Sequence, residues 1–112
     1  MTDYEFGDVI LIPFPFTDQT TTKKRPAVVV SSTSYHRSRS DIVLMAITSQ
    51  VKPSVSFGEV TVAEWERAGL IKPSAIKPIF TTVEKSLVIK KIGQLHPEDQ
   101  QTLKNTLQTI LG

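Results

Sequence analysis

Residues 23–32, KKRPAVVVSS, place three cations directly before a proline and an apolar run. Proline has no N–H and is tolerated at the first position of a strand. The ring of Pro26 also restricts the backbone of Arg25 to extended conformations. The sequence therefore predicts a strand over residues 26–32, with the guanidinium of Arg25 leaving a stiff piece of chain where that strand begins.

Two other segments, 8–14 and 41–48, are rich in β-branched and other apolar residues. Their apolar runs are nearly continuous rather than alternating, which indicates strands that are buried on both faces. Shorter strands are predicted at residues 75–76, 79–83 and 87–92. Short strands joined by tight loops favour a mainly β protein with short helices, built as a small curled antiparallel sheet or barrel.

A short helix is predicted between these groups of strands. Thr61 is followed three residues later by Glu64, which is the spacing of a capping box. The helix is expected to run through Trp65 and to end at Gly69. Trp65 is interpreted as the aromatic anchor that packs this helix against the core.

A closing helix is predicted from residue 97 onward. Pro97 suits the first helical position, and the acids Glu98 and Asp99 suit the first turn. An apolar stripe at helical spacing follows, and it is interpreted as core or dimer contact: Leu103, Leu107, Ile110 and Leu111.

The chain has 112 residues, enough for one compact domain, so residues 1–112 are expected to form a single domain. With 39% hydrophobic and 21% charged residues, its composition is that of a soluble globular protein. No apolar run approaches the roughly 20 residues that span a bilayer, and no signal peptide is evident. The absence of cysteine also fits the cytoplasmic location that we expect.

Positive charge is concentrated in one region, although the formal net charge is only +2. Residues 19–40 contain no acid and five cations, which are Lys23, Lys24, Arg25, Arg37 and Arg39. A local cationic zone of this kind is what contact with phosphate requires. Two basic surface loops are the alternative interpretation, because loops are commonly polar and exposed.

Arg25 and Thr48 form a candidate phosphate site. Arg25 precedes one predicted strand and Thr48 ends another, with residues 33–40 as the connection between them. If these strands pair as an antiparallel hairpin, the start of one meets the end of the other. A guanidinium fork and a hydroxyl would then lie at the same end of the sheet, where they suit phosphate oxygens.

This pair suits RNA cleavage by the substrate's own 2′-hydroxyl, which needs neither a metal nor a protein nucleophile. Arg25 would stabilise the charge that develops at the phosphate, by roughly 3–4 kcal/mol if it resembles an oxyanion-hole donor, and Thr48 would orient the phosphate. Arginine scarcely deprotonates, so His36 is the candidate acid or base if its loop folds over the site. A solvated loop histidine is the alternative. No metal or cofactor motif is present in the sequence, so neither is predicted.

Five segments occur in an order that resembles the MazF/PemK toxins of bacterial type II toxin–antitoxin pairs: GDVILIPF, KRPAVVVSS, IVLMAITS, WERAGLIKPS and TTVEKSLVIKKIGQL. The resemblance covers about residues 6–110. It implies a curled SH3-like barrel of the CcdB/MazF kind, a homodimer, and a metal-independent, sequence-specific endoribonuclease that cleaves single-stranded RNA. It also implies a cognate antitoxin whose acidic, flexible tail lies across the basic groove.

The resemblance places the family's catalytic arginine at Arg25 and its catalytic threonine at Thr48. The RNA-binding residues that the resemblance and the charge pattern together imply are Phe16, Thr17, Lys23, Lys24, Ser49 and Ser74.

The first loop departs from the family pattern. Many MazF/PemK proteins carry a Gly-Ser-Glu type signature there, whereas this chain has TDQTTTKK, in which Asp18 is the only acid. Two alternatives therefore stay open besides an RNA-cleaving toxin. One is a family member that binds RNA or antitoxin without cleaving. The other is a gyrase-directed CcdB-like toxin, which the absence of an aromatic residue after Phe80 disfavours.

Overall fold

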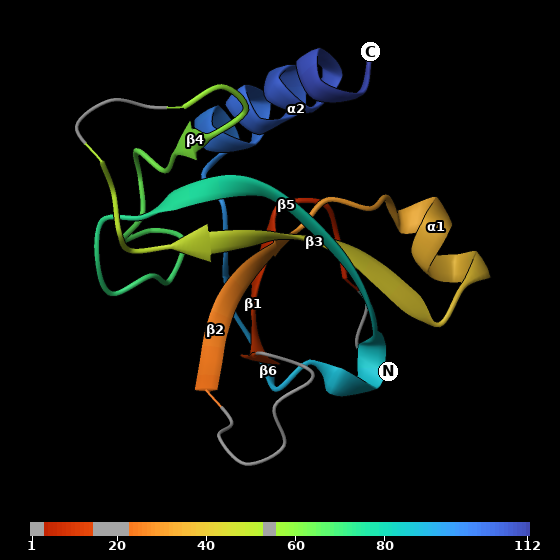
Figure 1. The fold of residues 1–112 in the computed structure, drawn as a ribbon. Coiled ribbons are helices and arrows are strands. Elements are labelled where there is room, and N and C mark those ends of the chain that lie inside the picture. The colour runs from red at the N-terminus through yellow and green to blue at the C-terminus, as the bar shows by residue number, and fades with distance from the viewer. Residues whose placement is uncertain (1–3, 15–22, 53–55) are drawn as a thin grey trace.

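A computed structural model describes residues 4–14, 23–52 and 56–112 (Figure 1). The predicted RNA-binding residues Phe16 and Thr17 lie outside these ranges, as does Asp18 of the first loop.

The described strands form one antiparallel sheet that curls on itself, as predicted (Figure 1). The strand order is β4-β5-β3-β2-β1-β6. The elements in chain order are β1 Asp8–Phe14, β2 Lys23–Val29, α1 Thr33–Ser38, β3 Asp41–Thr48, β4 Val60–Thr61, β5 Ala75–Glu84, the 3₁₀ turn η1 Lys85–Leu87, β6 Lys90–Gln94 and α2 Pro97–Leu111. Because β1 lies between β2 and β6, the sheet is complete only when the beginning and the end of the chain have met.

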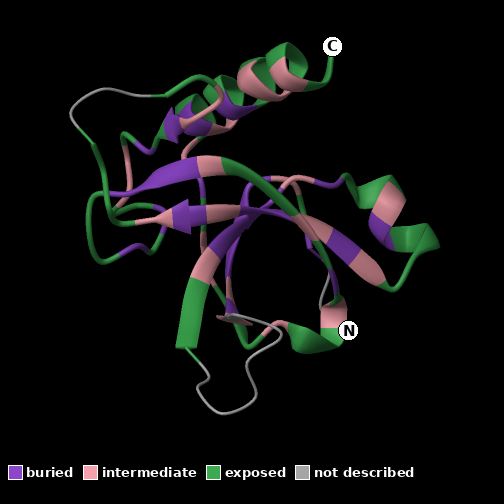
Figure 2. Ribbon diagram, in the orientation of Figure 1, coloured by how far each residue is buried: buried purple, intermediate pink, exposed green. Residues whose placement is uncertain are grey.

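The central strands are buried on both faces, which confirms the prediction made from their continuous apolar runs (Figure 2). One face carries a cluster that includes Val9, Val28 and Met45 and that packs against α2. The other face, inside the curl, carries Ile10, Val29, Leu44 and their neighbours. Alternate residues of the same strand therefore supply two separate cores.

Helix α2 closes the sheet at the position that the sequence indicates. Its N-cap is His96, whose side chain accepts a hydrogen bond from the Glu98 amide at 3.3 Å. Leu103 is fully buried and Leu107 packs against the same cluster, whereas Leu111 is 70% exposed. The predicted stripe is thus core in its first half and surface in its second. Trp65 packs against this cluster too, as predicted.

The helix predicted after Thr61 is wrong, because residues 63–69 form a series of turns. The carboxylate of Asp99 on α2 accepts from the amides of Ala63 and Glu64, at 3.0 and 2.9 Å. A distant carboxylate therefore fills the place that the capping box predicted for Thr61. Gly69 ends the turns as expected, with φ of +85°.

The connection between β2 and β3 is also more than a loop. Residues 33–38 form helix α1, whose N-cap Ser32 accepts from the Tyr35 amide at 3.2 Å. β5 continues through the predicted break at residues 77–78. Among the described residues, no helix is both long and apolar enough to cross a membrane.

Candidate functional site

Arg25 and Thr48 are brought together by the pairing of β2 with β3. In the register of these two strands, Ala27 lies opposite Ala46 and Val28 opposite Met45. Continuing this register by two residues places Arg25 opposite Thr48. Both side chains line one cavity of about 180 Å³, which we call the threonine cavity. The two residues that the sequence predicted to share one end of the sheet do so.

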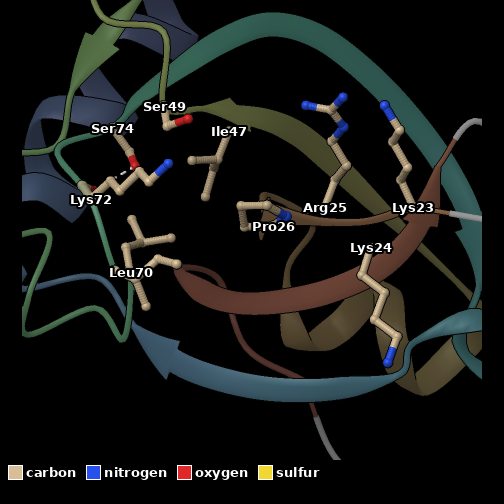
Figure 3. Close-up of a pocket in the computed structure, with 10 residues that line it drawn as sticks. Lys23, Lys24, Arg25, Pro26, Ile47, Ser49, Leu70, Lys72 and Ser74 are labelled. Atoms are coloured by element: carbon tan, nitrogen blue, oxygen red, sulfur yellow. Dashed lines mark hydrogen bonds between the residues drawn. The ribbon is translucent and has the colours of Figure 1, made fainter.

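A second cavity of about 430 Å³ shares Arg25, Pro26 and Ile47 with the first, and we call it the cationic cavity (Figure 3). Its lining comes from three segments: β2, the end of β3 with the residue that follows it, and residues 70–74. β2 supplies one side, and residues 70–74 supply the other (Figure 3). Its residues are Lys23, Lys24, Arg25, Pro26, Ile47, Ser49, Leu70, Ile71, Lys72 and Ser74. Arg25 therefore stands between the two cavities.

The three cations of β2 are exposed, Pro26 is half-buried, and the rest of the strand is buried (Figure 2). Side chains alternate along a strand, so neighbours point to opposite faces. Figure 3 shows Lys23 and Arg25 pointing to one side and Lys24 to the other. The side chains of Lys23 and Arg25 thus point to the same face of β2. Lys24 adds positive charge on the opposite face of the strand.

The hydroxyls of the site differ in what they can donate. Thr48 is partly buried, and its Oγ1 accepts from the Gln50 amide at 3.1 Å. That bond uses an oxygen lone pair, so the hydroxyl proton can still be donated to a ligand. Ser74 is 4% exposed and donates to the Lys72 carbonyl at 2.8 Å. Ser74 therefore shapes the wall of the cavity, and Ser49 presents an exposed hydroxyl beside it.

Lys77 is a member of the site that the sequence interpretation missed. It lines the threonine cavity with Arg25 and Thr48. The register between β3 and β5 shifts between Met45 and Ile47, where a single β3 residue faces three of β5. One of these three is Pro78, which cannot donate to the ladder. The bulge turns Lys77 toward the cavity, and the lysine beside a mid-strand proline was the available signal.

His36 is not part of either cavity, so the condition for an acid or base role, that its loop folds over the site, is not met. The alternative, a solvated loop histidine, is wrong as well, because His36 is buried on a helix. It is 7% exposed and lies on α1, away from the beginning of β2 (Figure 1). Its Nδ1 lies 2.7 Å from the Tyr4 carbonyl, which can only accept, so Nδ1 carries the proton. Nε2 pairs with the hydroxyl of Ser31, whose oxygen also accepts from the Val43 amide at 3.0 Å. These bonds anchor α1 to the sheet.

Comparison with known proteins gives the family. The model of the PemK-like, MazF-like toxins of type II toxin–antitoxin systems matches residues 5–111. This chain belongs to that family. The resemblance inferred from the five ordered segments is therefore confirmed. The comparison with curated protein sequences gave no match.

Solved structures of MazF proteins share the fold. A MazE–MazF complex from Deinococcus radiodurans matches with a TM-score of 0.77 and 18% identity, covering 99% of this chain and 98% of that one. A mycobacterial endoribonuclease in complex with its cognate antitoxin matches at 0.75 and 17%, covering 100% and 96%. The Mycobacterium tuberculosis toxin MazF-mt6 matches at 0.74 and 17%, covering 93% and 95%. The MazF-like fold that the sequence predicted is therefore confirmed over nearly the whole chain.

Proposed function

We propose that this MazF-like chain is a toxin that acts as a metal-independent, sequence-specific endoribonuclease on single-stranded RNA in the cytoplasm. The observation that carries the proposal is that Arg25 and Thr48 line one cavity, at the end of the sheet where β2 begins and β3 ends. Lys77 lines the same cavity, and Lys23 lines the adjoining one. Cations and a hydroxyl that converge in this way suit the oxygens of a phosphodiester.

The proposed reaction uses the RNA's own nucleophile. The 2′-oxygen attacks the phosphorus and loses its proton, the bond from phosphorus to the 5′-oxygen breaks, and that oxygen gains a proton. The products are a 2′,3′-cyclic phosphate and a 5′-hydroxyl. Arg25 donates hydrogen bonds to the oxygens on which charge develops, worth roughly 3–4 kcal/mol. Thr48 donates its hydroxyl proton and holds the phosphate in line for attack.

The cationic cavity offers contacts to the RNA on either side of the cleaved phosphate. Lys23 and Lys72 stand on its two sides, where they reach phosphates that flank the cleaved one. Ile71 is 87% exposed on the same wall, and Leu70 lines the cavity behind it. Apolar surface beside a charged groove suits unstacked bases, so recognition of unpaired rather than double-stranded RNA follows.

We further propose a homodimer that uses an apolar surface around β5. Ile79 and Phe80 point to opposite faces of the strand, yet they are 52% and 39% exposed. Phe57 is 81% exposed. Its neighbour Gly58 lies close to Pro78 of β5 and to Ile110 near the end of α2. An apolar patch of this kind on a small protein marks an interface.

A cognate antitoxin would compete with RNA for the same cations. One matched structure is an endoribonuclease in complex with its cognate antitoxin, and another is a MazE–MazF complex. We propose that an acidic, flexible segment of this chain's own antitoxin lies over Lys23, Arg25 and Lys72, because carboxylates suit the same donors as phosphates.

The test is incubation of the purified protein with a long RNA in excess EDTA, with mapping of the new 5′ ends. We expect cuts at one short recurrent motif, and a rate about 10²–10³-fold lower for Arg25→Ala. Arg37→Ala is the matched control, since it removes an exposed cation on α1 outside both cavities. An Arg25→Ala protein as active as wild type would overturn the mechanism. Tight RNA binding without any cut would instead support a member that binds without cleaving.

A further inference from the structure

Asp99 is a buried carboxylate that holds the backbone of a distant segment. It lies in the first turn of α2 and is 3% exposed. Its two oxygens accept separately from the amides of Ala63 and Glu64, at 3.0 and 2.9 Å, across 36 and 35 residues of chain. Hydrogen bonds to an ionised acceptor are about twice as strong as neutral ones, so this is a firm attachment.

The attached segment leads directly to the wall of the cationic cavity. Within it, the amide of Ala68 donates to the Glu64 carbonyl, and that of Leu70 to the Trp65 carbonyl. Gly69 fits against the Ile92 carbonyl so closely that an added Cβ would lie 2.1 Å from that oxygen. The path from the Asp99 attachment to Leu70 is therefore fixed at both ends.

The wall itself closes back on the same segment. The amide of Val62, the residue before Ala63, donates to the Ser74 carbonyl at 3.0 Å. The wall residues Leu70, Ile71, Lys72 and Ser74 thus lie between two attachments. Leu70, Lys72 and Ser74 lie across the cavity from the β2 cations (Figure 3). Residues 62–64 therefore connect the Asp99 carboxylate to the end of this wall.

We propose that Asp99 is a positioning residue for RNA binding, which sets the width of the cationic cavity by fixing the wall of residues 70–74 opposite β2. The inference rests on the proposed function. Asp99 lines neither cavity and acts through the backbone amides of Ala63 and Glu64. With the wall fixed in advance, RNA binding does not have to order it.

The test substitution is Asp99→Asn. The amide side chain has nearly the same shape, but only one of its two terminal atoms can accept, so one backbone N–H loses its partner. We expect KM for RNA to rise about 10-fold while kcat at saturating RNA stays within about twofold, because the wall must now be ordered on binding. A purely structural role would do the reverse. It would lower the folded fraction, and hence apparent kcat, and leave KM unchanged.

Asp8→Asn is the matched control. Asp8 is also fully buried, and it accepts from the Glu5 amide at 2.8 Å and from Gln94 at 2.9 Å, with Lys91 Nζ 3.1 Å away. It lines neither cavity. Asp8→Asn likewise removes a hydrogen-bond acceptor from a buried carboxylate, but none of the partners of Asp8 lines the wall, so we expect KM to stay at the wild-type value.

Binding is measured separately from cleavage with an RNA that carries a 2′-deoxy nucleotide at the cut position, by fluorescence anisotropy. We expect Asp99→Asn to bind about 10-fold more weakly and Asp8→Asn to bind like wild type. An Asp99→Asn protein whose Kd and KM both equal those of wild type would overturn the positioning role while leaving the nuclease intact. Wild type that neither binds nor cuts RNA would remove the proposed function itself, and the positioning role with it.

Amide hydrogen exchange in the wild-type protein covers the case in which Asp99→Asn does not fold. Exchange at Ala63 and Glu64 is expected to slow when the uncleavable RNA binds, whereas the Glu5 amide, held by Asp8, is expected not to change. Unchanged exchange at Ala63 and Glu64, with RNA bound, would show that the Asp99 hydrogen bonds and the binding site are not coupled.

Discussion

Lys77 reaches the threonine cavity because the sheet is irregular beside it. Pro78 interrupts the ladder, and the resulting bulge re-aims its neighbour toward Arg25 and Thr48. The proline was visible in the sequence, but it predicted a break between two strands. Whether a mid-strand proline ends a strand or bulges it depends on the neighbouring strand, here β3, and a single segment does not contain that information.

Tyr4 gives the residue-scale prediction. It is 7% exposed, and burial, with a smaller effect from the charge of Asp8, raises the pKa of its phenol above the ordinary value of 10.0. Its contribution to stability is therefore fully present below the unfolded-state pKa and is lost as pH rises through the higher folded-state pKa. We expect Tyr4→Phe to make the free energy of unfolding less pH-dependent above about pH 10. Urea titrations at pH 8 and at pH 10.5 measure this. A variant whose stability falls as steeply as that of wild type over this interval would contradict it.

At the scale of elements, sequence motifs predicted a helix correctly when the residues that stabilise its first turn lie within that turn. The start of α2 was readable because Pro97 and the acids after it act within their own turn. The segment after Thr61 was not, because its amides are held by Asp99, a residue more than thirty positions away. A capping-box spacing predicts a helix only when the threonine of that box accepts from the first free amides of the helix.

The two halves of α2 should respond differently to truncation of a leucine. Leu103 is fully buried between α2 and the sheet, so Leu103→Ala is expected to destabilise the protein by about 2–5 kcal/mol. Leu111 is 70% exposed, so Leu111→Ala is expected to change stability by less than about 0.5 kcal/mol in the monomer. Chemical denaturation of both variants gives the comparison, and equal losses would mean that the helix packs differently.

At the scale of the whole molecule, the sequence predicted the sheet more completely than the candidate site. Arg25 and Thr48 could be paired from the sequence because consecutive antiparallel strands bring a start to an end. The opposite wall of the cationic cavity could not be predicted, because it depends on how residues 62–74 pack against α2 and β6. Those contacts join segments that no sequence periodicity connects.

The proposed dimer is the prediction at this scale. A charge introduced into the exposed apolar surface of β5, as in Ile79→Asp, should abolish self-association, because an unpaired carboxylate would be buried between two copies. Leu87→Asp is the control, since Leu87 is 43% exposed on η1. Sedimentation velocity over a concentration series measures the oligomeric state of both variants. A control that dissociates while Ile79→Asp remains dimeric would place the interface elsewhere.

Helix α2 follows every strand in the chain, and this order matters while the protein is being made. A polypeptide leaves the ribosome beginning with its N-terminus, so Arg25 and Thr48 emerge well before Asp99 and Leu103 do. A nascent chain that has not reached β6 lacks the neighbour of β1 as well. If Asp99 positions the wall of the cationic cavity as proposed, that wall is not held in place until residue 99 has been added. The ribosome that makes this chain would then meet no finished toxin during most of that round of translation.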